Sequence, residues 1–177
     1  MRPTLFVYDG VSSRARGPIG PLANGGFEVS YVPDDGAEHR VPITQAAWAV
    51  PLEHGSPVRR FTSRKGQRHL SRLWWSATTG GHVGFESWLE RDHLLNLDFD
   101  PTVVGIASQP FWLHWIDAGQ AGLARAGLLR PPKRWLGGGG RPVERRRPRD
   151  VAKFEATARA CALAGWEYRL LGEADAW

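Results

Sequence analysis

Three observations along the 177 residues predict an α/β fold. An amphipathic helical segment at 85–97 stands directly before an apolar, strand-like segment at 103–117. Apolar residues alternate through 27–43, where Asp35 and Gly36 form a typical hairpin turn. A second helix–strand pair is predicted near the C-terminus, with a helix at 150–164 and a strand at 166–172. The chain is long enough to bury one core, so we expect a single domain over 27–177.

The first third of the chain is less regular around its hairpin. Residues 1–26 are rich in Gly, Pro and Ser, and we expect a poorly ordered lead-in there. Residues 44–61 have a mixed pattern that ends in an extended segment. Residues 63–83 interleave Arg and Lys with Trp74 and Trp75 and then reach a Gly80–Gly81 turn.

The helix at 85–97 has two distinct faces. A mostly apolar face contains Phe85, Trp88, Leu89, Asp92 and Leu95. Glu86, Glu90 and His93 share another face by their i, i+4, i+7 spacing, so we expect Glu90 to point away from the core. The helix gives way to a turn at Asp100–Pro101, and the strand that follows is expected to bend at Pro110.

The regular order fails in the next segment. Residues 118–142 contain no β-branched residue, a Pro131–Pro132 pair and four consecutive glycines. They show neither strand alternation nor a helix face, so we expect 118–142 to be irregular and the central strands to be disrupted. A regular helical pattern begins again at Asp150, which is a predicted helix N-cap. This last helix is expected to stop at Gly165.

Composition limits the class of protein. Cys161 is the one cysteine, which excludes an internal disulfide and a multi-cysteine zinc site and fits a reducing cytoplasm. No run approaches the length of a membrane span, and the first residues lack the apolar core of a signal peptide. We therefore expect a cytoplasmic protein without a membrane partner.

The net charge of +5 is concentrated in one segment. Residues 123–149 contain nine Lys or Arg and one acid, whereas the remainder contains 14 basic and 17 acidic residues. Such a block either binds a phosphate backbone or forms a solvated arm, and both interpretations stay open. The candidate DNA contacts are Arg64, Lys65, Arg68 and Arg72, beside the two tryptophans, and Arg145, Arg146 and Arg147. For the first group the alternative is a charged outer face over an aromatic core.

Glu90 is the strongest candidate for metal chemistry. Hydrolysis of DNA near neutral pH uses a divalent cation, and Mg²⁺ prefers carboxylate oxygens. However, the Ser87-x-x-Glu90 spacing is also a capping box, in which the glutamate only caps the helix start. Taken alone, this motif favours the cap.

Several sequence words in order resemble the TnsA-like endonuclease subunit of heteromeric transposases. They are FESWLERD, LDFDP, VVGIASQPFWL, RPVERRRPRD and KFEATARACALAGWEYRL. The resemblance implies a restriction-endonuclease-like core with a central mixed sheet flanked by helices, and a PD-(D/E)xK type site that uses Mg²⁺ or Mn²⁺. It also implies double-stranded DNA at transposon ends as substrate and a separate strand-transfer transposase as partner.

The resemblance also assigns residues. Glu90 matches the first metal carboxylate, Gln109 matches the glutamine of the family's Gln-Pro-Phe, and Arg141 stands at the position of the catalytic lysine. An arginine there can hold phosphate but transfers protons poorly, because it is permanently charged. The family's Pro-Asp motif, which supplies the second carboxylate, is missing, since no acid occurs between Asp117 and Glu144.

A codon-level interpretation accounts for the missing motif. One allowed back-translation of 123–132, read one nucleotide later, encodes SHAPDYFAR, which is the missing family word. We therefore predict two compensating frameshifts, genomic or introduced in sequencing, that bracket roughly residues 120–140 and place the lost aspartate at Gly127.

These patterns together predict a transposon-end endonuclease subunit whose cleavage activity is impaired in this copy. Two alternatives stay open. One is a non-catalytic module that binds DNA or a transposase, and the other is a non-functional pseudogene product that does not fold stably.

Overall fold

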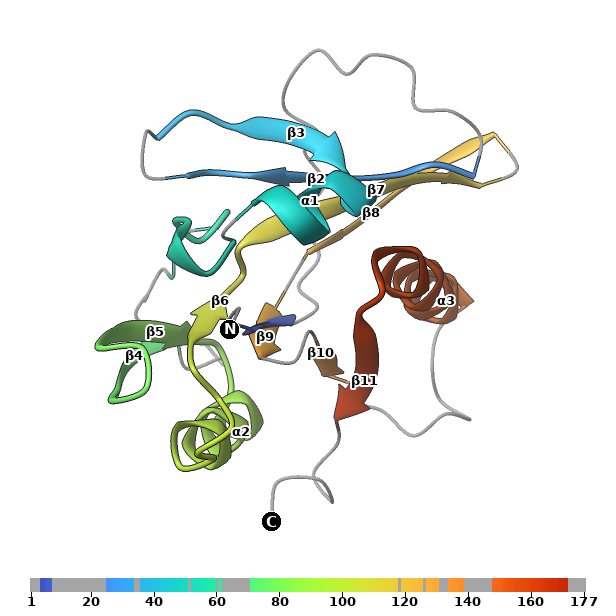
Figure 1. The fold of residues 1–177 in the computed structure, drawn as a ribbon. Helices are drawn as coiled ribbons and strands as arrows, with labels where there is room; N and C mark the ends of the chain where they lie inside the picture. Colours follow the sequence, from blue (N-terminus) through green and yellow to red (C-terminus); the bar gives the residue numbers. More distant parts are fainter. Residues whose placement is uncertain are drawn as a thin grey trace.

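The computed structural model describes residues 4–7, 25–33, 36–50, 52–59, 61, 71–117, 119–125, 127–130, 134–138 and 148–171. Within these residues the chain forms three sheets and three α-helices, with a short 3₁₀ helix η1 (Leu52–His54). Figure 1 shows one sheet above α1 and α3, and a second sheet below them. The predicted α/β class is confirmed at this level.

The upper sheet is antiparallel and has the order β3-β2-β7-β8. Its strands are β2 (Phe27–Tyr31), β3 (His39–Pro42), β7 (Phe111–Asp117) and β8 (Gln120–Arg125). The hairpin predicted at 27–43 is confirmed as β2–β3, with Gly36 at a φ of 76° in the connection. That positive φ suits glycine, which has no Cβ to clash.

The main core lies between this sheet and two helices, α1 (Ile43–Ala49) and α3 (Pro148–Ala164). Because side chains alternate along a strand, Val29, Phe111 and Leu113 all reach the same inner face and are completely buried. Small residues of α3, including Ala156 and Ala160, let the helix approach the sheet closely. The helix α1 lies in a segment whose mixed sequence pattern did not indicate a helix.

The apolar run at 103–117 is split into two strands, as the expected bend at Pro110 indicated. The first, β6 (Ile106–Ser108), belongs to the lower sheet, whereas β7 belongs to the upper one. The lower sheet has the order β1-β6-β9-β10-β11. Its other strands are β1 (Thr4–Val7), β9 (Gly127–Arg130), β10 (Arg134–Gly138) and β11 (Glu167–Leu171).

The prediction that 118–142 is irregular is wrong for the three strands that it contains. β8 pairs with β7, and β9 lies between β6 and β10. Backbone hydrogen bonds, rather than β-branched side chains, hold these strands in place. Gly122 illustrates the reason, because the indole of Trp115 lies across it where a Cβ would overlap the ring. The expectation that residues 1–26 form a poorly ordered lead-in is also wrong for Thr4–Val7, which forms β1.

The C-terminal helix ends where the sequence indicated and starts earlier than expected. Gly165 has a φ of 67°, and the amides of Gly165 and Trp166 donate to the carbonyls of Ala162 and Cys161. These two bonds make a Schellman end. α3 begins at Pro148, so Asp150 lies in the first turn instead of capping it. The chain then enters β11, which runs parallel to β10.

A separate two-stranded hairpin packs against α2 (Trp88–Asp98). It consists of β4 (Arg72–Ser76) and β5 (Gly81–Phe85). Asp98 at the end of α2 fixes the β4–β5 hairpin in place. Its carboxylate accepts hydrogen bonds from Trp74 Nε1 at 3.0 Å, Ser76 Oγ at 2.7 Å and Thr78 N at 2.9 Å. Burial raises the pKa of Asp98, but these hydrogen bonds outweigh it and lower the pKa to about 2.

We expect Asp98→Asn to lower the free energy of unfolding by about 1–3 kcal/mol, because several donors lose a charged acceptor. Since the folded pKa lies below the ordinary 3.8, the ionised carboxylate stabilises the fold above about pH 4, and this contribution is lost as the pH falls towards 2. Urea unfolding across this range checks both effects. Asp117→Asn is the control, because its ion pair with Arg159 is exposed and contributes little. Equal effects of the two substitutions would refute the role of Asp98.

A second pH effect comes from His114 on the outer face of the upper sheet. Its Nε2 lies 2.8 Å from Ser30 Oγ. Burial, together with the charge of Arg40, lowers the pKa of His114 to about 4. The unfolded chain takes up this proton near pH 6.5 and the folded chain does not, so stability is lost as the pH falls from 6.5 to 4. We expect His114→Gln to reduce this loss in urea unfolding. An unchanged pH slope in His114→Gln would contradict the assignment.

Candidate functional site

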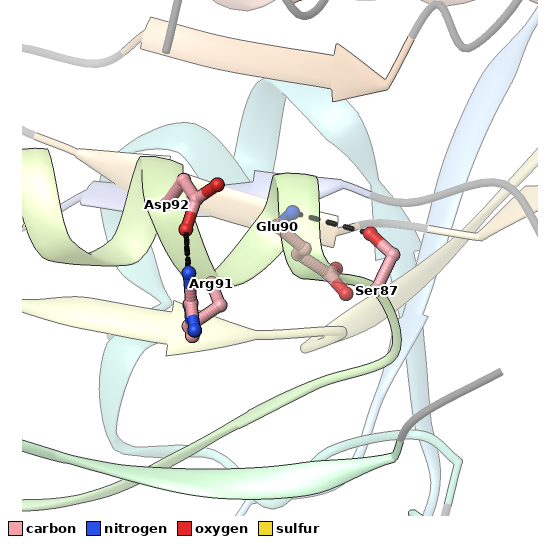
Figure 2. Close-up of polar contacts among 4 residues, drawn as sticks. All are labelled: Ser87, Glu90, Arg91 and Asp92. Atoms are coloured by element: carbon pink, nitrogen blue, oxygen red, sulfur yellow. Dashed lines mark hydrogen bonds and ion pairs between the residues drawn. The ribbon is translucent and has the colours of Figure 1, made fainter. Parts of the chain in front are cut away.

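The start of α2 is held by a reciprocal cap between Ser87 and Glu90. Ser87 Oγ accepts from the amide of Glu90 at 3.1 Å, and Glu90 Oε2 accepts from the amide of Glu86 at 2.5 Å. This is the capping-box exchange displaced by one residue, since the glutamate reaches the amide before the N-cap. Figure 2 shows Ser87 and Glu90 facing each other, with Arg91 and Asp92 paired separately. The cap that the sequence motif favoured is therefore present.

The expectation that Glu90 points away from the core is wrong. Glu90 is only 3 % exposed and shares the buried face of α2 with His93, Leu94 and Leu97. Trp88, counted with the apolar face, is instead exposed beneath the guanidinium of Arg91. The i, i+4, i+7 spacing gave the wrong face for Glu90 for two reasons. The reciprocal cap draws the Glu90 carboxylate inward, and Leu94 and Leu97, one and two turns later, bury the same side of the helix.

A continuous set of contacts connects Glu90 with Gln109. The amide that Glu90 accepts from belongs to Glu86, whose carboxylate lies 3.5 Å from Arg59 Nη1. The residue before Arg59 is Val58, whose amide donates to the carbonyl of Gln109 at 2.7 Å. Residues 58–59 therefore contact both the start of α2, through Glu86, and the carbonyl of Gln109. Arg59 and Glu86 were not assigned to the site from the sequence, where their only signals were a basic run and a helix-start acid.

Gln109 has the most unusual backbone among these residues. It is the non-glycine residue with a positive φ, 51°, among the described residues, and its side chain is completely buried. A left-handed backbone conformation is costly for a side-chain-bearing residue and persists only where the surroundings enforce it. Such residues often mark sites where geometry matters more than stability. The neighbouring Ser108 is also buried.

The strand register places Gly127 at the end of the β6–β9 ladder. β6 and β9 are antiparallel, with Ala107 opposite Leu129 and Ser108 opposite Leu128. The next positions along the two chains are Gln109 and Gly127. The residue at which the missing aspartate is expected therefore lies one position beyond the last pair of the β6–β9 ladder, and its partner in β1 is Val7. Gly127 is the first residue of β9 and supplies no side chain for chemistry.

The described side chains do not fit a Mg²⁺ ion. Such an ion takes oxygen ligands in a strict octahedral arrangement, usually from one or two carboxylates and from water. One oxygen of Glu90 is engaged in the helix cap, and Gly127 contributes nothing. Over the part of the chain that the structure describes, no three residues of the types His, Cys, Asp and Glu gather as a metal site.

The other candidate DNA contacts lie on β4 or outside the described residues. Arg72 is exposed at the start of β4. Asp98 and Asp100 serve the structure, because Asp98 holds the hairpin and Asp100 accepts from Thr102. Cys161 is buried in α3, where burial raises the pKa of its thiol. The residues outside the described ranges are Arg64, Lys65, Arg68, Arg141, Arg145, Arg146 and Arg147.

Comparison of the chain with protein-family models, with curated proteins and with solved structures finds no match. Among the helices of the described residues, none has the length and apolar character needed to cross a membrane.

We expect Glu90→Ala to lower the free energy of unfolding by about 0.5–2 kcal/mol, because the amide of Glu86 loses its acceptor. Glu90→Gln keeps an acceptor oxygen and should cost less. Ser87→Ala is the matched variant for the other half of the cap. Thermal unfolding of the three variants measures these costs. A Glu90→Ala protein more stable than the parent would contradict the capping role and would indicate a carboxylate retained for function against stability.

Proposed function

We propose that this chain is a DNA-processing subunit of the TnsA-like endonuclease type, with a restriction-endonuclease-like core, that retains part of a nuclease site and cleaves DNA poorly or not at all. The observation that carries the proposal is the burial of two polar residues, Glu90 and Gln109, whose surroundings are linked through residues 58–59. Glu90 and Gln109 were assigned by the sequence resemblance, and the contacts through Glu86, Arg59 and Val58 join them.

Two properties of the candidate site support impaired cleavage. Residue 127 at the start of β9, where the resemblance expects the second carboxylate, is a glycine. One oxygen of Glu90 also accepts a short hydrogen bond from the helix start, and a metal would have to compete with it. The sequence places Arg141 where the family has a lysine, and a permanently charged guanidinium is a poor proton donor or acceptor. Substrate and partner are those of the resemblance: double-stranded DNA at transposon ends, and a separate strand-transfer transposase.

A supercoiled plasmid in the presence of Mg²⁺ or Mn²⁺ tests the proposed loss of cleavage. We expect no nicking above that of Glu90→Ala, because the remaining carboxylate cannot position a metal alone. Gel separation of nicked and supercoiled forms measures the result. Robust nicking by the parent chain that Glu90→Ala abolishes would contradict the proposal and restore an active endonuclease.

A second candidate is a non-catalytic module that binds DNA or a transposase. The observation that favours it is the use of Glu90 as a structural cap, which gives this residue a role without catalysis. DNA binding that weakens steeply with salt, without cleavage, is the expected behaviour of such a module. Measurement of binding and nicking on the same DNA separates it from an active enzyme.

The third interpretation, a pseudogene product that does not fold, predicts that the chain shows no cooperative thermal transition. A folded domain of this size unfolds in one cooperative thermal transition, whereas an unfolded chain shows none. Calorimetry on the whole chain decides between the two. The coding DNA for residues 118–142 tests the frameshift hypothesis, which fails if its codons cannot encode the family's Pro-Asp word in the shifted frame.

A further inference from the structure

The β4–β5 hairpin has an apolar face that is exposed to solvent. Leu73 is 60 % exposed and Trp75 is 59 % exposed, and they lie two residues apart on the same side of β4. His82, directly opposite Trp75, is also exposed, and its ring meets the indole edge-on with centroids 5.1 Å apart. Gly84, opposite Leu73 on the same face, is covered by the ring of Phe61, so the exposed part of this face consists of Leu73, Trp75 and His82.

The opposite face of the same hairpin is buried and firmly held. Trp74 and Ser76 alternate with the exposed pair, and both donate to Asp98 at the end of α2. Val83 and Phe85 of β5 belong to the core beneath the hairpin. The exposed face is therefore backed by a buried one, and the ring contact given for Trp75 is the one with His82 on the same exposed face.

The occupant that fits this face is duplex DNA, and the first argument is charge. Residues 54–85, which include the whole hairpin, contain six Lys or Arg and not one Asp or Glu. Two of these basic residues lie in the described part of the chain, Arg72 in β4 and Arg59 next to the candidate site. An acid-free basic segment attracts a polyanion through counterion release.

The second argument is shape. β4 and β5 form a two-stranded sheet of their own among the described strands. A two-stranded ribbon is one of the elements that the major groove of DNA admits, and apolar side chains contact thymine methyl groups there. Arg59 also connects this surface to the candidate site through its ion pair with Glu86, the residue that follows β5.

We infer that the face formed by Leu73, Trp75 and His82 enters a groove of duplex DNA and positions it against the cluster around Glu90. The inference rests on the proposed function, because it takes DNA as the partner. It gives the two neighbouring tryptophans different roles. Trp75 contacts DNA, whereas Trp74 holds the hairpin on α2.

Fluorescence anisotropy with a labelled DNA duplex of about 30 base pairs tests the inference. We expect Trp75→Ala to raise the Kd at least about fivefold and Leu73→Ala to raise it in the same direction. Leu163→Ala is the matched control, because Leu163 is 59 % exposed on α3, in another part of the fold. It should leave the Kd unchanged. Circular dichroism confirms that each variant keeps the parent fold.

Salt dependence supplies a second readout that a loss of folding would not imitate. Trp75→Ala removes no charge, so the slope of log affinity against log salt should stay as in the parent. Arg72→Ala should lower the slope by about 1.

The experiment distinguishes a failure of the proposed function from a failure of the hairpin inference. If the parent chain does not bind the duplex at low salt, the DNA partner of the proposed function is wrong and the inference falls with it. If the parent binds while Trp75→Ala and Leu73→Ala bind as tightly as Leu163→Ala, the inference alone is overturned. The hairpin face would then serve a different partner, such as a protein.

Discussion

The break between Gln109 and Pro110 is the constraint on which the rest of the structure depends. It ends β6 in the lower sheet and starts β7 in the upper sheet, so one apolar run serves both. A proline cannot donate to a strand ladder, and the positive φ of Gln109 turns the chain at the same point. β7 then pairs with β2 and β8, and β6 pairs with β9. The Gln109 side chain at this turn is completely buried.

Both ends of α2 are fixed by carboxylates, but in different ways. Asp98 at the C-terminal end holds the tip of the hairpin with several hydrogen bonds, which lower its pKa to about 2. Glu90 at the N-terminal end closes the helix cap and lies buried beside His93. An anion at a helix N-terminus is stabilised by the backbone amides, whereas Asp98 depends on donors from another element. The helix is thus a rigid link between the exposed hairpin and the cluster around Gln109.

Much of the fold followed from sequence patterns, because those elements depend on local chemistry. The hairpin at 27–43, the helix start at Ser87, the break at Pro110 and the helix end at Gly165 all carry their own signals. The strands β8, β9 and β10 carry none, since they contain no β-branched residue and their apolar residues do not alternate. They form because neighbouring strands offer hydrogen-bonding edges and because Trp115 covers the surface that Gly122 leaves open.

The sequence by itself determined the chemistry of the candidate site: which residue types are present, that Ser87 and Glu90 are spaced for a cap, and that an acid is missing between Asp117 and Glu144. Only the tertiary structure decided that Glu90 faces inward, that Arg59 pairs with Glu86, and that β9 lies beside β6. It also separated Trp74 from Trp75, which sequence pattern alone treats alike. The physical reason is that spacing along a chain sets local hydrogen bonds, whereas burial and pairing depend on which distant segments pack against it.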